Sequence, residues 1–152
     1  MSNLICYSLD QNSIRYLEII KYNINFISFF IPKWKIRFYL KSDNRIKNEL
    51  SNFKNCELFF FDYGSINFSK FLAISEKSKV ERFLVRNYKY YFNILEINMI
   101  KKWIDSNKLF HLISTNDKLL QYDLIGINNL ELDRQKISIH FNFNRNYEGI
   151  CD

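Results

Sequence analysis

Two cationic side chains, Arg86 and Lys89, follow an apolar run near the middle of the chain. That run, Val80 to Val85, is predicted to be a strand, and it ends in the apolar residues Phe83, Leu84 and Val85. A cation held at a strand end can neutralise negative charge on a phosphate group without help from a metal ion. The pair therefore indicates a metal-free phosphate clamp. The alternative interpretation is that Lys89 is a solvated loop charge and Arg86 a partly exposed residue at the strand end.

Three carboxylates, Asp10, Asp62 and Asp117, also follow predicted strands. At such positions a carboxylate can meet a ribose hydroxyl or a metal ion, or act as a general base toward an acceptor hydroxyl. Aspartate is also a common turn residue, so a structural role is the alternative for each of them. We take Asp117 as the candidate catalytic residue.

The first predicted strand ends at Tyr7 and Ser8, which are placed to contact a ligand bound at the end of that strand. The two histidines, His111 and His140, have no cysteine or histidine partner at metal-ligand spacing. A single histidine on a short apolar strand is usually a buried, hydrogen-bonded side chain. We therefore predict no metal site at either histidine.

The spacing of apolar residues predicts the elements that position these side chains. Strands are expected over residues 4–9, 35–40, 56–61, 80–85 and 109–113, with an edge strand over 137–143. Helices are expected between residues 14 and 31, capped by Asn12 or Ser13, and over 44–50, 66–74 and 94–104. This alternation implies an α/β fold with an open, mostly parallel, Rossmann-like sheet and helices on both faces. Ligands of such sheets bind at the carboxyl ends of the strands.

The chain length of 152 residues predicts a single domain spanning residues 1–152. A net charge of +6 favours an anionic partner, such as a nucleotide diphosphate, a nucleic acid or an acidic membrane face. The three cysteines form no paired framework, which indicates reduced thiols. Because no export signal or membrane span is visible, we expect a cytoplasmic protein. The many Phe and Tyr residues accompany an excess of other residues with A- and T-rich codons, so they are weak evidence for ring stacking.

Three stretches of the chain carry a pattern found in one known family. The first is Pro32-Lys33-Trp34-Lys35-Ile36-Arg37-Phe38-Tyr39, and the second is Lys70-Phe71-Leu72-Ala73. The third is the strand Arg82 to Arg86, followed after a helix by Trp103-Ile104-Asp105-Ser106-Asn107-Lys108-Leu109-Phe110-His111. In this order they resemble the nucleotide-diphospho-sugar glycosyltransferases of the GT-A fold type. The resemblance extends from Leu4 to about Ile127 and implies the same type of fold.

In that family an Asp-x-Asp motif follows the strand that Arg82 to Arg86 resembles, and its carboxylates hold a divalent metal on the diphosphate of the sugar nucleotide. Asn87 and Lys89 stand at the two aspartate positions here, so a Mn or Mg cofactor is not expected. The resemblance and the strand-end positions together give a nucleotide-binding set of Tyr7, Ser8, Lys70, Arg86 and Lys89. The family's acceptor-side loop, Gly-Gly-x-Trp-Gly, appears as Tyr122-Asp123-Leu124-Ile125-Gly126.

Two functions stay open. The chain is expected to bind a sugar nucleotide at the carboxyl edge of its sheet and to transfer the sugar, or to be a catalytically inactive relative that serves as a binding or scaffold module. The family continues well past the position of Asp152, so the inactive form is expected to use a second copy or a partner subunit to cover exposed faces. Nucleic-acid binding is not expected, because the sequence has no helix-turn-helix, zinc or RNA-recognition signature.

Overall fold

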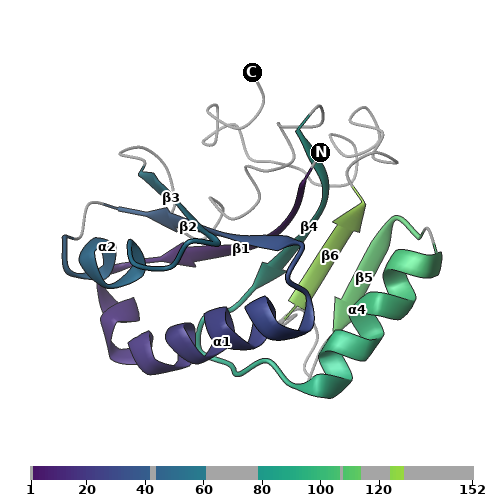
Figure 1. The fold of residues 1–152 in the computed structure, drawn as a ribbon, viewed down its shortest axis with the longest axis horizontal. Coiled ribbons are helices and arrows are strands. Elements are labelled where there is room, and N and C mark those ends of the chain that lie inside the picture. The colour runs from purple at the N-terminus through teal and green to yellow at the C-terminus, as the bar shows by residue number, and fades with distance from the viewer. Residues whose placement is uncertain (1, 42–43, 61–78, 107, 114–123, 129–152) are drawn as a thin grey trace, which may run out of the picture.

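A twisted six-stranded sheet forms the centre of the molecule (Figure 1). The computed structural model describes residues 2–41, 44–60, 79–106, 108–113 and 124–128. The strand order is β3-β2-β1-β4-β6-β5, and β6 is antiparallel to both of its neighbours while β1 to β4 are parallel. The strands are β1 (Ser2–Leu9), β2 (Trp34–Leu40), β3 (Cys56–Phe60), β4 (Val80–Arg86), β5 (Phe110–Ile113) and β6 (Leu124–Asn128). The expected open, mostly parallel α/β sheet is confirmed.

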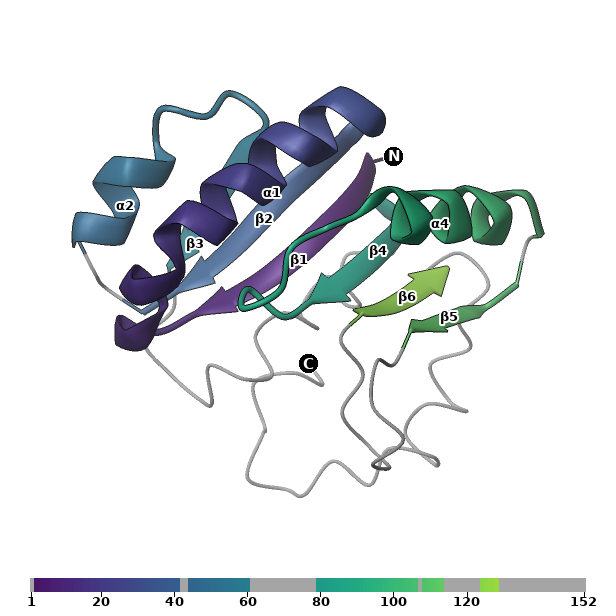
Figure 2. The same cartoon turned by 90° about the horizontal axis from the view of Figure 1, so that it is seen from below.

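All the helices within the described ranges lie on one face of this sheet (Figures 1 and 2). They are a 3-10 helix, η1 (Gln11–Tyr16), that leads directly into α1 (Leu17–Phe30), then α2 (Asn44–Leu50) and α4 (Ile94–Ser106). The helix expected over 66–74 and the strand expected over 137–143 lie outside the described residues. The single domain expected over 1–152 stays a prediction for the same reason.

Side chains of the central strands are buried on both faces. On β1, Ile5, Tyr7 and Leu9 belong to the core beneath the helices, and Leu4 and Cys6 belong to a second core on the other face. Burial on both faces explains the nearly continuous apolar runs in the sequence, because a strand with one solvated face would alternate apolar and polar residues.

The first helical segment begins at a cap that differs from the predicted one. Asp10 is the N-cap, and it accepts hydrogen bonds from the amides of Asn12 and Ser13. The prediction of Asn12 or Ser13 as the cap is wrong, since Ser13 is the third helical residue and bonds back to the Asp10 amide to complete a capping box. The end of this helical segment agrees with the prediction, because α1 ends at Phe30, two residues before Pro32.

Strand β6 was not predicted, because Leu124 to Gly126 match the end of the family's acceptor-side loop. The structure corrects this interpretation. Gly126 lies within β6, where it pairs with Leu84 of β4 and with His111 of β5. None of the described helices combines the length and apolar character that crossing a membrane requires.

Candidate functional site

The carboxyl ends of β1 and β4 form the point where the chain reverses its direction across the sheet. β1 is followed by its neighbour β2 on one side, while β4 pairs with β1 on the other side. Open α/β sheets bind ligands in the crevice at such a switch point. Residues Asp10 and Asn87 to Lys89 directly follow these two strands, so this edge is the first place to look for a site.

Four side chains meet at this edge: Asp10, Tyr16, Tyr88 and Lys89. The Tyr88 hydroxyl lies 3.5 Å from Oδ1 of Asp10, which links the end of β4 to the end of β1. The rings of Tyr16 and Tyr88 meet edge to face with 5.5 Å between their centroids. The Lys89 amino group lies 5.7 Å from the centroid of Tyr16 and 6.0 Å from that of Tyr88. We call these four residues the switch-point cluster.

Asp10 makes its contacts through one of its two carboxylate oxygens. Oδ1 accepts hydrogen bonds from the Asn12 amide at 2.9 Å and from the amide and hydroxyl of Ser13, both at 3.1 Å. Oδ2 has no partner within the described part of the chain. Asp10 is therefore first a helix cap, with one carboxylate oxygen remaining for a further donor.

The tip of the loop after β4 is a tight turn stabilised by Asn87. Its Oδ1 accepts a hydrogen bond from the Lys89 amide at 3.1 Å, a common use of asparagine in turns. The turn leaves the Lys89 side chain exposed beside the two tyrosine rings. Cation–π contacts at an exposed site contribute only about 0.5–1 kcal/mol each, so they orient the ammonium group and leave it available.

The three described residues that directly follow β4 offer no carboxylate to a divalent metal. The two positions that carry carboxylates in the resembling family hold an amide, already used by the turn, and an ammonium group. Hard divalent cations require oxygen ligands, and an ammonium repels them. Within the described ranges, no three His, Cys, Asp or Glu side chains gather in a way that could hold a metal ion.

Arg86 is placed in the interior, apart from the switch-point cluster. Its side chain is 2% exposed and forms an ion pair with Glu96 of α4. Nη2 also donates a hydrogen bond to the backbone oxygen of Tyr91 at 2.9 Å, and the guanidinium lies 4.7 Å from the Phe92 ring centroid. These contacts give Arg86 a structural role that joins β4 to α4, and the nucleotide contact predicted for it gains no support from this position.

Tyr7 and Ser8 point to opposite faces of the sheet, because successive side chains alternate along a strand. Tyr7 is 1% exposed in the core beneath the helices, where its ring stacks on Phe38 at 5.3 Å. Burial raises the pKa of Tyr7 well above its usual range, although the nearby charge of Arg86 opposes the rise. The predicted base or ribose contact of Tyr7 is therefore at odds with its buried position, whereas Ser8 is only partly buried.

The remaining candidates fall into two groups. Lys70, Asp62, Asp117 and His140 lie outside the described residues, so their predicted roles stay predictions. His111 is described on β5 at the far end of the strand order from β3, separated from β4 by β6. Its ring stacks on Trp103 with 5.6 Å between centroids, and burial lowers its pKa. The structure thus places His111 in a packing role away from the switch point.

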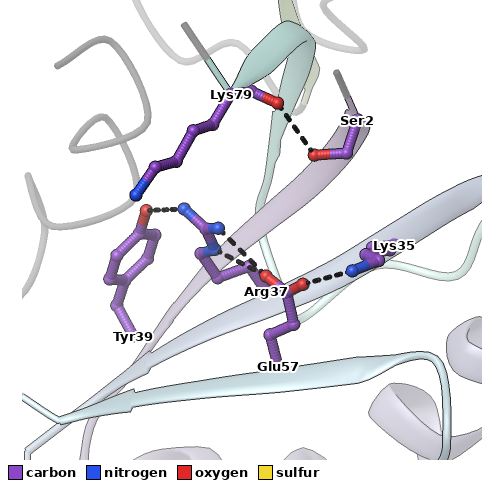
Figure 3. A network of polar contacts seen from close by, with 6 residues as sticks. All are labelled: Ser2, Lys35, Arg37, Tyr39, Glu57 and Lys79. Atoms are coloured by element: carbon purple, nitrogen blue, oxygen red, sulfur yellow. Dashed lines mark hydrogen bonds and ion pairs between the residues drawn. The ribbon is translucent and has the colours of Figure 1, made fainter. Parts of the chain in front are cut away.

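A second polar cluster lies on the face of the sheet away from the helices (Figure 3). Glu57 of β3 receives hydrogen bonds from Lys35 at 2.9 Å and from Nε and Nη2 of Arg37 at 3.1 and 3.0 Å. Burial alone would raise the pKa of Glu57, but the two cations outweigh it and the pKa is lowered. The cluster joins β3 to β2, so it holds β3, an edge strand of the described sheet, to its neighbour.

Sequence reasoning missed the aromatic half of the switch-point cluster. Tyr16 and Tyr88 were discounted because the general excess of aromatic residues made any single ring uninformative. Position was the available signal: Tyr88 follows a predicted strand end, and Tyr16 stands where the first helix opens. Because the carboxyl ends of parallel strands lie at the same edge of a sheet, these two positions together would have predicted that the Tyr16 and Tyr88 rings lie close to each other.

Comparison with known proteins finds similarity in structure and none in sequence. No family model and no curated protein sequence matches the chain. A protein assigned as a nucleotide-diphospho-sugar transferase, from Desulfovibrio desulfuricans G20, superimposes with a TM-score of 0.55 and 9% identity. A 4-diphosphocytidyl-2C-methyl-D-erythritol synthase from Anaerococcus prevotii DSM 20548 superimposes with a TM-score of 0.53 and 11% identity.

The superimposed regions include most of this chain but a smaller share of each solved structure. They cover 88% and 85% of this chain, and 66% and 70% of the two solved chains respectively. The chain thus spans about two thirds of the length of the structures it matches. At these identities the likeness concerns the fold alone. The sheet order, the switch point and both superpositions agree that the chain has a nucleotide-diphospho-sugar transferase-like fold.

Proposed function

We propose that the chain binds a sugar nucleotide at the switch-point cluster, with Lys89 neutralising the diphosphate in place of a divalent cation. The observation that carries this proposal is the position of the Lys89 ammonium, exposed at the end of β4 and flanked by two rings. The two solved structures similar in fold are named for nucleotide-diphospho-sugar and cytidyl-diphosphate chemistry, which makes this ligand class the natural one to test.

The proposal depends on simple electrostatics. A diphosphate carries negative charge that increases on the leaving group when a sugar is transferred, and a fixed cation stabilises that charge. A lysine provides a point charge with three donors, without the ligand cage that a metal requires. The net charge of +6 favours the approach of such an anion to the molecule.

Calorimetric titration tests this binding. The panel consists of uridine, guanosine and cytidine diphosphate sugars, each with and without manganese. We expect binding that needs no metal, and a loss of about tenfold in affinity for Lys89→Ala, the size of a hydrogen bond to a charged group. Lys54→Ala is the matched control, because Lys54 is also an exposed lysine in a turn but precedes β3 at the opposite edge. Binding that depends on manganese, or no binding across the panel, would contradict the proposal.

A second candidate function is a binding module without turnover. The observation in its favour is the replacement of both expected carboxylates by Asn87 and Lys89, which removes the groups that hold the metal in the resembling family. Release of nucleoside diphosphate from a bound sugar nucleotide separates the two functions. Transfer predicts release that falls on Asp117→Asn, since Asp117 is the candidate base. A binding module predicts a bound but intact sugar nucleotide, together with self-association or a partner in sedimentation experiments.

A further inference from the structure

One buried side chain, Asn23, connects α1 to the segment between β4 and α4. Asn23 is 1% exposed on the inner face of α1. Its Nδ2 donates a hydrogen bond to the backbone oxygen of Tyr90 at 2.9 Å, and its Oδ1 accepts one from the Phe92 amide at 2.8 Å. Figure 2 shows this segment turning back after β4 and running beside α1 to reach α4. The amide thus holds two backbone groups of the segment, one on each side of Tyr91.

The rest of the same segment is also tied to the core. Arg86 donates to the Tyr91 oxygen at 2.9 Å. Asn93 and Glu96 form reciprocal bonds at 3.0 and 3.1 Å that cap α4. Residues 90–93 therefore form a fixed base, and the turn at residues 87–89 projects from it. Of these ties, Asn23 is the one that comes from α1.

This origin matters because α1 follows directly on η1, which ends at Tyr16. Asn23 holds the base of the loop, and Tyr16 of the same continuous helical segment meets the tip of the loop at Tyr88 and Lys89. We propose that Asn23 is a positioning residue that keeps Lys89 and Tyr88 in place against Tyr16 for diphosphate binding. The identity of the ligand in this inference rests on the proposed function. The positioning of the loop by Asn23 does not, because it concerns the ligand-free protein.

An uncharged amide is suited to this role. The Tyr90 oxygen needs a donor and the Phe92 amide needs an acceptor, and asparagine provides both from one short side chain. Aspartate would lose the donor and bring a charge into the interior, and alanine would leave both backbone groups unpaired. The other buried residues of α1 are Ile20, Ile24 and Ile27, so Asn23 is the polar side chain among the buried positions of this helix.

The structural part is tested on the ligand-free protein by NMR. Asn23→Ala is compared with Asn25→Ala, the same replacement at an exposed asparagine two positions along the same helix. We expect Asn23→Ala to increase hydrogen exchange at the Lys89 amide about tenfold and to weaken the ring contact between Tyr16 and Tyr88, as expected when a coupled contact of about 1.4 kcal/mol is lost. Asn25→Ala should leave both unchanged.

A change confined to the Phe92 amide would overturn the inference, because it would show only a local bond. Asn23→Ser gives the same comparison if the alanine variant does not fold.

The ligand part uses a double-mutant cycle with the sugar nucleotide that binds best in the titration panel. Asn23→Ala should weaken binding about fivefold or more in the wild-type background and add little in the Lys89→Ala background, since coupled residues are non-additive. Additive losses would overturn the positioning role. If the unmutated chain binds no nucleotide, the proposed function fails and the NMR comparison alone decides the inference, so the two failures can be distinguished.

Discussion

The guanidinium of Arg86 and the carboxylate of Glu96 form an ion pair in the interior of the protein, with 2.5 Å between Nη1 and Oε1. The two side chains are 2% and 8% exposed. Arg86 is the last residue of β4, and Glu96 stands in the first turn of α4, so the pair fixes the point where the loop returns to the helix layer. A buried pair adds little net stability when intact, but removing one partner leaves an uncompensated charge.

We therefore predict that Glu96→Gln lowers the free energy of unfolding by about 3–5 kcal/mol, measured by urea denaturation. The neutral side chain keeps the size of glutamate while leaving the Arg86 charge buried. Glu18→Gln is the matched control, because Glu18 also lies in the first turn of a helix but its side chain is 87% exposed. Its effect should stay within about 0.5 kcal/mol. Equal losses in the two variants would contradict a special role for the pair.

This pair also explains why the sequence identified Arg86 as a candidate but did not predict its ion pair with Glu96. A cation at a strand end can face a ligand or the interior, and the direction depends on a carboxylate ten residues later in the chain. Glu96 is polar, so the helical pattern of apolar residues in α4 gave no sign that it lies on the buried face with Ile97 and Ile100. The direction of the Arg86 side chain therefore depends on a tertiary contact, which the local sequence does not reveal. Tyr7 is a related case, because its position near the strand end gives no sign of the helices that cover it, and its nucleotide contact stays a prediction.

The sheet was easier to predict than the site. Strands buried on both faces have nearly continuous apolar runs, and β1 has one, while β2 and β4 contain the shorter runs Phe38-Tyr39-Leu40 and Phe83-Leu84-Val85. The short strand β6 was not predicted because Leu124 to Gly126 match the family's acceptor-side loop, and because glycine is depleted in strand interiors. Close packing explains this glycine: a Cβ built there would lie 2.8 Å from Leu84 Cδ2, 3.0 Å from His111 Cβ and 3.1 Å from Trp103 Cη2.

From that geometry we predict that Gly126→Ala is destabilising by about 1–3 kcal/mol, as expected for overpacking. The His111 Cβ is attached to the backbone of β5, so it cannot move aside as easily as the tip of Leu84. Thermal unfolding followed by tryptophan fluorescence provides the measurement, since Trp103 lines the site. In a Leu84→Ala background the loss should be smaller, because one of the three close contacts is gone. An unchanged melting temperature for Gly126→Ala would show that the strands separate without cost.

His111 should make the protein sensitive to mild acid. Burial lowers its pKa below the usual value of 6.5, and Nε2 has no hydrogen-bond partner within the described ranges. A histidine with a lowered folded-state pKa gains its proton more readily in the unfolded chain. Stability should therefore be constant above pH 6.5 and decrease as the pH falls below it. His111→Gln should remove this decrease and His140→Gln, which removes the other histidine, should retain it. The measurement is urea denaturation between pH 5 and pH 8, and identical slopes in all three proteins would refute the prediction.

Glu57 should produce a separate loss of stability at lower pH. Its pKa lies below the usual 4.5 because the hydrogen bonds from Lys35 and Arg37 outweigh the effect of burial. The contribution is present above pH 4.5 and disappears as the pH falls through the lowered value. Glu57→Gln should cost about 1–2 kcal/mol at pH 7 and flatten the acid limb of the stability curve. The Glu57 effect lies at lower pH than the His111 effect, so both can be measured separately when the same series is extended below pH 4.5, with Glu81→Gln on β4 as the control.

The last prediction concerns the face of Tyr16. Its ring meets Tyr88 and the Lys89 ammonium, and no hydrogen bond of its hydroxyl is part of the switch-point cluster. If the ring orients Lys89 toward a diphosphate, Tyr16→Phe should bind a sugar nucleotide as the unmutated chain does, while Tyr16→Ala should bind it about three- to fivefold more weakly, the scale of one exposed cation–π contact. Phe29→Ala on the same helical segment, at a ring that is 78% exposed and whose printed ring contact is with Phe30 of the same helix, is the control for general loss of a ring. Equal affinities for the phenylalanine and alanine variants of Tyr16 would assign the ring to packing alone, and Lys89 would then act without an aromatic partner.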